Sequence, residues 1–148
     1  MLSTHLRPMQ EQDLPAVYRL EEASQFFPWP HWFFRRTLRR HASCWVLEKD
    51  NEIIGFGIIE IEKGVAHIMN MCVAAAYRRH GLGRRILLQL LVIAKTQHAR
   101  KVWLEVRARN RPARLLYRKL GFRPKAIRKG YYLSPHGRQN AIIMARKL

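Results

Sequence analysis

A single carboxylate stands out in the second part of the sequence. Residues 63–148 contain 21 Lys and Arg side chains but only one acidic residue, Glu105. Glu105 belongs to a predicted strand, 102–107, in which apolar and polar residues alternate, and we expect it where a site beside a sheet can open. There it could accept the proton that an amine must lose before or during nucleophilic attack. An ion pair with Arg107 or another arginine fits the same position, and both interpretations stay open.

Two glycines precede a predicted helix in the segment Gly81-Leu82-Gly83. Four arginines flank them: Arg78, Arg79, Arg84 and Arg85. Free backbone N–H groups and the positive end of the helix dipole favour an anion at such a place, and glycine lets a phosphate approach the backbone. A phosphate-bearing cofactor is one interpretation, and a tight strand-to-helix turn with solvated arginines is the other. The spacing is neither Gly-x-x-x-x-Gly-Lys-Ser/Thr nor Gly-x-Gly-x-x-Gly, which argues against P-loop and dinucleotide-binding proteins.

Covalent and metal chemistry have little support in the sequence. Cys44 and Cys72 lie in apolar segments, which predicts neither a disulfide nor a cysteine-rich zinc site and fits a reducing cytoplasm. We interpret Cys72 as a small strand residue rather than a nucleophile. His67 and His80 have no metal-ligand partners at usable spacing, so we expect no metal.

The spacing of apolar residues predicts the elements that must position these groups. The first predicted helix follows Asp13, which would cap it. Three further helices are predicted over 32–40, 86–94 and 113–120. The predicted strands cover 44–48, 53–61, 65–73, 102–107 and 141–145, and Gly55 and Gly57 indicate a bulge or a close backbone approach. This is an α/β pattern for one domain, residues 1–148, with a sheet covered on both faces.

The composition agrees with one compact domain. The chain has 148 residues, of which 48% are hydrophobic and 26% charged, so it fits neither disordered nor fibrous classes. No stretch approaches the roughly 20 apolar residues of a membrane span. The formal net charge of +18 indicates either an anionic partner, such as a phosphorylated cofactor, ribosomal RNA or an acidic substrate, or a role in solubility.

Several motifs, in order, resemble those of the GNAT superfamily of N-acetyltransferases. They are Arg78-x-x-Gly81-x-Gly83 after a strand ending Asn70-Met71-Cys72-Val73, then Leu104-Glu105-Val106-Arg107-x-x-Asn110, then Leu116-Tyr117-x-x-x-Gly121-Phe122. The segments Phe27-Pro28-Trp29, Tyr131-Tyr132, Gly137-Arg138 and Ala141-Ile142-Ile143-Met144 extend the resemblance, over nearly the whole chain, to the RimI-like N-terminal alanine acetyltransferases. The resemblance implies a GNAT-like fold, with a single mixed, mostly antiparallel central sheet of about six or seven strands covered by about four helices.

The resemblance also implies roles for individual residues. Acetyl-coenzyme A would be bound by Met71, Cys72, Val73, Arg78, Arg79, His80, Gly81, Leu82, Gly83, Arg84 and Asn110. Glu105 would be the general base and Tyr117 the general acid, with direct transfer in a ternary complex. A phenol is a weaker acid than a thiol, so Tyr117 could also stabilise the leaving thiolate by a hydrogen bond, or it could simply be a core tyrosine.

By the same resemblance, the substrate is the N-terminal alanine of a small-subunit ribosomal protein. RimI-like enzymes often carry an acidic pair after Gly-Arg, whereas this chain has Gln139-Asn140. A chain of charge +18 should repel a basic substrate tail unless local groups or RNA intervene, and docking on ribosomal RNA is one hypothesis. Two alternatives stay open: a GNAT enzyme for a small amine or lysine side chain, and a non-catalytic basic module that binds the ribosome or RNA. We expect a cytoplasmic monomer that does not contact membranes.

Overall fold

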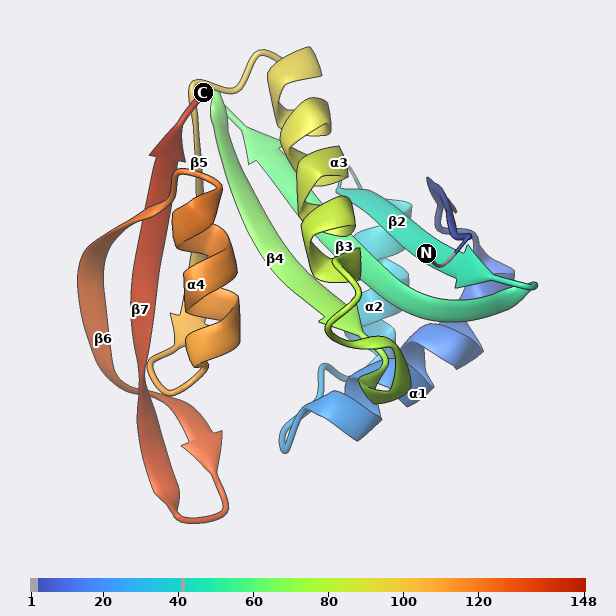
Figure 1. Cartoon of the computed structure of the whole chain (residues 1–148), viewed down its shortest axis with the longest axis horizontal. Coiled ribbons are helices and arrows are strands. Elements are labelled where there is room, and N and C mark those ends of the chain that lie inside the picture. The colour runs from blue at the N-terminus through green and yellow to red at the C-terminus, as the bar shows by residue number, and fades with distance from the viewer. Residues whose placement is uncertain (1–2, 41) are drawn as a thin grey trace.

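A seven-stranded sheet forms the centre of the protein (Figure 1). The computed structural model describes residues 3–40 and 42–148. The strands are β1 (His5–Pro8), β2 (Ser43–Lys49), β3 (Glu52–Glu62), β4 (Val65–Val73), β5 (Lys101–Arg107), β6 (Arg123–Ser134) and β7 (Gly137–Lys147), in the spatial order β1-β2-β3-β4-β5-β7-β6. Of the strand pairs in these described ranges, β4 and β5 are parallel and the other neighbouring pairs are antiparallel. The expected mixed, mostly antiparallel sheet is confirmed.

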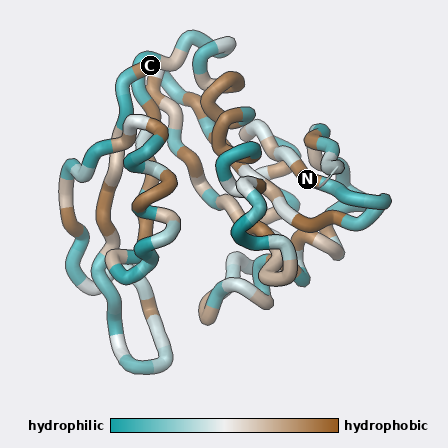
Figure 2. Tube along the Cα trace, viewed as in Figure 1, coloured by the Kyte–Doolittle hydropathy of each residue, from teal (hydrophilic) through white to brown (hydrophobic). Residues whose placement is uncertain are grey.

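In the described part of the chain, four α-helices cover the two faces of this sheet. They are α1 (Leu14–Ser24), α2 (His31–Arg39), α3 (Leu82–Thr96) and α4 (Arg111–Lys119). One hydrophobic cluster joins α3 and α4 to the sheet, and a second joins α1 and α2 to it. In Figure 2, hydrophobic residues gather along the central strands and on α3, while the loop between β6 and β7 is mostly hydrophilic. No helix in the described ranges is both long and apolar enough to cross a membrane.

The parallel strands β4 and β5 separate soon after they pair. Their pairing joins Val65–His67 to Lys101–Trp103, yet β4 continues to Val73 and β5 to Arg107 (Figure 1). A strand edge without a neighbouring strand presents free N–H and C=O groups. The divergence therefore leaves the second half of β4 with one edge unpaired and opens a wedge in the middle of the sheet.

Helix α3 packs unusually close to β3 because two residues there lack a side chain. A Cβ atom on Gly57 would lie 2.6 Å from Cγ2 of Ile86, and one on Gly55 would lie 3.0 Å from Cδ1 of Ile86 and 2.9 Å from the carbonyl oxygen of Cys72 on β4. All three distances are shorter than van der Waals contact allows. The close backbone approach expected at these two glycines is confirmed, and it fixes α3 against β3 and beside β4, the strand on one side of the wedge.

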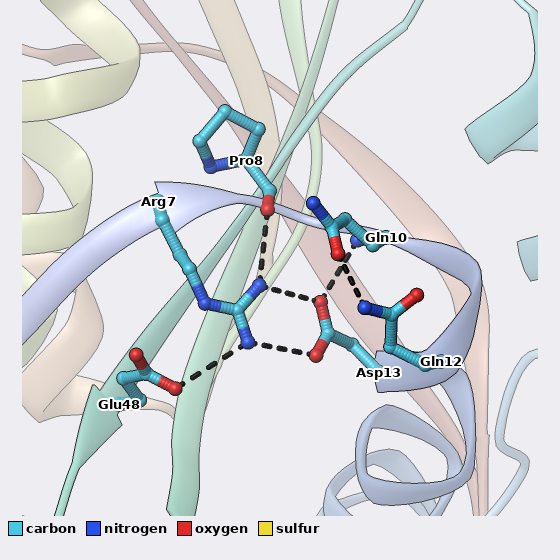
Figure 3. A network of polar contacts seen from close by, with 6 residues as sticks. All are labelled: Arg7, Pro8, Gln10, Gln12, Asp13 and Glu48. Atoms are coloured by element: carbon cyan, nitrogen blue, oxygen red, sulfur yellow. Dashed lines mark hydrogen bonds and ion pairs between the residues drawn. The ribbon is translucent and has the colours of Figure 1, made fainter. Parts of the chain in front are cut away.

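Two strands and one helix cap differ from the sequence predictions. Strand β1 has only four residues, and most of β6 is exposed on both faces, so neither shows the alternation by which strands are recognised. Asp13 occupies the N-cap position of α1, as expected, but its side chain makes no capping hydrogen bond to this helix. Its carboxylate instead accepts hydrogen bonds from the Arg7 guanidinium and from the backbone N–H of Gln10, and so ties β1 to the turn before α1 (Figure 3).

Candidate active site

A cleft of about 410 Å³ opens where β4 and β5 separate. Its floor is formed by the two strands and α4, one wall by α1 and the loop after it, and the other wall by the β6–β7 hairpin. The lining residues are Glu21, Ser24, Gln25, Phe27, Trp29, Ile68, Met69, Asn70, Met71, Leu104, Glu105, Val106, Arg107, Asn110, Tyr117, Tyr131, Tyr132 and Leu133. Four residues proposed from the sequence, Met71, Glu105, Asn110 and Tyr117, thus meet in one cleft.

Glu105 lies on the floor of this cleft. Alternation along β5 places Val102, Leu104 and Val106 in the core and turns Glu105 to the opposite face, where its side chain is only 12% exposed. His67, on β4, donates a hydrogen bond from Nε2 to Oε2 of Glu105 at 2.9 Å. Among the residues that the structure describes, Glu105 has no arginine partner within ion-pair distance, so the alternative interpretation of this residue as an arginine's ion-pair partner is wrong.

Tyr117 reaches the same cleft from α4. The ring is buried and packs against Phe122, with 5.8 Å between ring centroids. Burial raises the pKa of its phenol to about 12. The hydroxyl group therefore keeps its proton throughout the neutral range and can act as a hydrogen-bond donor. Burial also raises the pKa of Tyr132, which lines the cleft near Glu105 and Tyr117.

The glycine loop follows β4 and a short 3-10 turn (Ala75–Tyr77), and helix α3 begins in it. Gly81 is the N-cap, with a φ of 75°, and Arg79 has a φ of 67°, so both lie in the left-handed region. Gly81 has open space around its missing side chain, since nothing lies within 4 Å of a Cβ built there. The first turn of α3 contains no acidic residue. Free N–H groups, the helix dipole and neighbouring arginines thus meet at an exposed backbone, an arrangement suited to a pyrophosphate.

The other residues assigned by resemblance to the cofactor lie on β4 and at the start of α4. Met71 and Val73 belong to the half of β4 that β5 does not cover, and the Val73 carbonyl accepts a hydrogen bond from Nε of Arg78. The thiol of Cys72 points to the other side, 3.0 Å from Oγ of Ser24, and burial raises its pKa. Asn110 caps α4 by accepting a hydrogen bond from the N–H of Ala113 at 3.3 Å.

Sequence reasoning missed several residues of the cleft. Glu21 is 2% exposed and accepts hydrogen bonds from the backbone N–H of Trp29 and from Nδ2 of Asn70. Burial raises its pKa. The sequence gives no sign that His67 contacts Glu105, because that contact depends on the pairing of β4 with β5. Among the residues that the structure describes, no group of three or more His, Cys, Asp and Glu side chains could hold a metal ion.

The fold and the cleft define an acetyltransferase. The model of the acetyltransferase (GNAT) family matches residues 10–122, and the chain belongs to this family. Over 137 residues, 93% of each chain, it is 35% identical to the ribosomal protein bS18-alanine N-acetyltransferase of Escherichia coli K12. The crystal structure of the ribosomal-protein-S18-alanine N-acetyltransferase from E. coli superposes with a TM-score of 0.92 at 33% identity, covering 98% of this chain and 94% of that one. Arabidopsis thaliana NAA60 in complex with acetyl-CoA shares the fold, with a TM-score of 0.88, 18% identity and 99% coverage of both chains. The GNAT assignment made from the motifs is confirmed.

Proposed function

We propose that this N-acetyltransferase transfers an acetyl group from acetyl-CoA to the N-terminal alanine of a protein, and that this protein is a ribosomal protein. The observation that carries the proposal is the meeting of Glu105 and Tyr117 in one cleft beside the unpaired edge of β4. The substrate is inferred from the activity named for the E. coli relatives of similar length. We further propose that the enzyme acts in the cytoplasm and that it acts as a monomer.

The cofactor fits the groups that the chain offers. Backbone N–H groups from Arg79 to Arg84 would hold the pyrophosphate, and Met71, Cys72 and Val73 would pair with the pantetheine arm as a neighbouring strand would. The Nδ2 of Asn110 is left to contact the cofactor, since Oδ1 caps the helix. Acetyl-CoA supplies the acetyl group as a reactive thioester.

The residues of the chain then supply proton transfers and positioning. Glu105 accepts the proton of the α-ammonium group, directly or through a water, because only the neutral amine has a lone pair for attack. The protonated phenol of Tyr117 donates a hydrogen bond to the leaving sulfur. Transfer is direct in a ternary complex, because Cys72 is a poor candidate for an acetylated intermediate. Burial raises the pKa of its thiol and so keeps it protonated, and the thiol lies within hydrogen-bond distance of Oγ of Ser24.

A basic surface accompanies this site. Residues 101–148 contain fourteen Lys and Arg and one acidic residue, and the exposed basic side chains of α4 and β6 include Arg111, Arg118, Lys125 and Arg128. We assign this surface to contact with ribosomal RNA. Co-sedimentation with ribosomes should be strong at low salt and fall steeply as salt rises, and its absence at low salt would refute this part of the proposal.

Mass spectrometry of a peptide panel tests the function. We expect acetylation at the α-amine of alanine-starting peptides, with none on N-blocked lysine peptides or polyamines. Glu105→Gln should lower kcat on the order of 100- to 10,000-fold with little change in the KM for acetyl-CoA, while Glu62→Gln, on the exposed end of β3, serves as the control. Transfer to lysine or small amines would instead establish the alternative acetyltransferase, and no transfer at all would favour the binding module.

A further inference from the structure

Arg107 lines one side of the cleft, and the groups that it contacts there carry no negative charge. Arg107 follows Glu105 by two residues on β5, so both side chains lie on the same face, about 7 Å apart along the strand. The Arg107 guanidinium lies 4.4 Å from the ring centroid of Tyr132. It donates hydrogen bonds to the carbonyl of Leu133 at 3.3 Å and to Oε1 of Gln139 at 3.4 Å. All of these partners are neutral.

The carboxylates that line the cleft are already engaged. Glu105 accepts the hydrogen bond of His67, and Glu21 accepts those of Trp29 and Asn70. Burial raises the pKa of Glu21, which disfavours its charged form. Among the described residues, neither carboxylate forms an ion pair with Arg107, and under the proposed function Glu105 faces the α-amine of the substrate.

The identity of residue 139 decides the charge at this place. A glutamate there could form an ion pair with Arg107, whereas the amide of Gln139 is uncharged. The neighbouring Asn140 is also neutral and accepts a hydrogen bond from the N–H of Gly130. Arg138, on the same hairpin, adds a further positive charge close to Gly130. Among the described residues, no carboxylate therefore lies within ion-pair distance of Arg107 at this wall of the cleft.

We infer that Arg107 makes the enzyme select protein N-termini with an acidic side chain at the second or third residue, and discriminate against Lys and Arg there. This inference rests on the proposed function. An extended chain advances about 3.3 Å per residue, so a substrate whose α-amine faces Glu105 brings its second and third residues level with Arg107. A carboxylate there gains a charge-assisted hydrogen bond in a half-buried site, while a cation meets like charge.

Free peptides test this selection, because no RNA then bridges the enzyme and its substrate. Three peptides of equal length beginning Ala-Asp-Glu, Ala-Ser-Gln and Ala-Arg-Lys are compared by kcat/KM. We expect the acidic peptide to exceed the basic one at least tenfold, with the neutral peptide between them, and the ratio to shrink in 0.5 M salt. Equal rates for the three peptides would overturn the inference and leave alanine acetylation intact, whereas no acetylation of any of them would overturn the proposed function.

Substitutions then assign the selection to Arg107. Arg107→Gln should bring the acidic-to-basic ratio close to one. Gln139→Glu adds a carboxylate beside Arg107 without removing the arginine, and it should also lower the acidic-to-basic ratio. This second variant keeps the test valid if Arg107→Gln disturbs the hairpin. Lys101→Gln removes the same charge at the far, exposed end of β5 and should leave the ratio unchanged. A ratio that falls equally in Lys101→Gln, or stays constant in Gln139→Glu, would show that overall charge and not Arg107 makes the choice.

Discussion

His67 holds Glu105 from the neighbouring strand, with 2.9 Å between Nε2 and Oε2. The imidazole is itself fixed, because it stacks on the ring of Trp103 with 3.9 Å between centroids and 7° between planes. This contact occurs at the last residue pair before β4 and β5 separate, where His67 lies beside Trp103 in the sheet. The end of the wedge where the strands still pair therefore orients the carboxylate that faces its open part.

Removal of this hydrogen bond should lower the catalytic rate without impairing cofactor binding. We expect His67→Leu to reduce kcat by about tenfold, the scale of one hydrogen bond to a charged group, with an unchanged KM for acetyl-CoA. His67→Gln retains an N–H donor and should recover a large part of the rate. If both variants lost the same activity, or if the KM for acetyl-CoA rose in step, His67 would have only a packing role.

Tyr117 should contribute its hydroxyl group and not only its ring. Tyr117→Phe preserves the packing against Phe122, so we expect a folded protein whose kcat is lower by about 10- to 100-fold. Because burial raises the pKa of the phenol to about 12, the wild type should show no rate loss from Tyr117 ionisation up to pH 10. Ultraviolet difference titration of wild type against Tyr117→Phe measures this directly, and a tyrosinate signal near pH 10 that vanishes in the variant would contradict it.

The alternating strands and the helix around the glycine loop could be predicted from the sequence because each depends on local patterning. Leu82–Thr96, for example, buries Ile86, Leu87, Leu90 and Leu91, which recur at helical spacing. The site was predictable only where a motif marks it. Glu21 and His67 give no local signal in the sequence. The position of Glu21 depends on a contact between α1 and β4, and that of His67 depends on a contact with Glu105, which is 38 residues away in the chain. Their roles follow from topology, which periodicity does not encode.

The phosphate-binding role of the glycine loop can be tested with two variants, Gly81→Asn and Gly81→Asp, that differ from each other mainly in charge. Gly81 has a φ of 75° with open space around it, and Asn and Asp tolerate the left-handed region better than other side chains do. Gly81→Asn should therefore cost little stability, and Gly81→Asp should cost about the same. A carboxylate beside the pyrophosphate site should raise the Kd for CoA by about tenfold relative to Gly81→Asn. Isothermal titration calorimetry measures both affinities, and equal values would remove the phosphate-binding role of the loop.

The pair of Arg7 and Asp13 should make stability depend on acid pH. The Asp13 carboxylate is 6% exposed and lies 2.7 Å from the guanidinium, and that contact lowers its pKa in the folded state below the unfolded value of about 3.9 (Figure 3). A carboxyl group whose pKa falls on folding binds fewer protons in the native state, so it stabilises the fold above the unfolded pKa. That contribution is lost as pH falls through the lower, folded pKa.

Arg7→Met leaves the carboxylate of Asp13 buried without its cation. We expect the free energy of unfolding at pH 7 to fall by about 1–3 kcal/mol, since the pair is only partly screened by solvent. The difference between wild type and variant should narrow as pH drops below 4, because a protonated Asp13 no longer requires the guanidinium. Urea unfolding at pH 7, 5 and 3 measures the trend, with Asp13→Asn as the reference that abolishes the titration. A difference that stays constant from pH 7 to pH 3 would show that Arg7 stabilises the protein by packing, and that the charge of Asp13 contributes nothing to the attachment of β1.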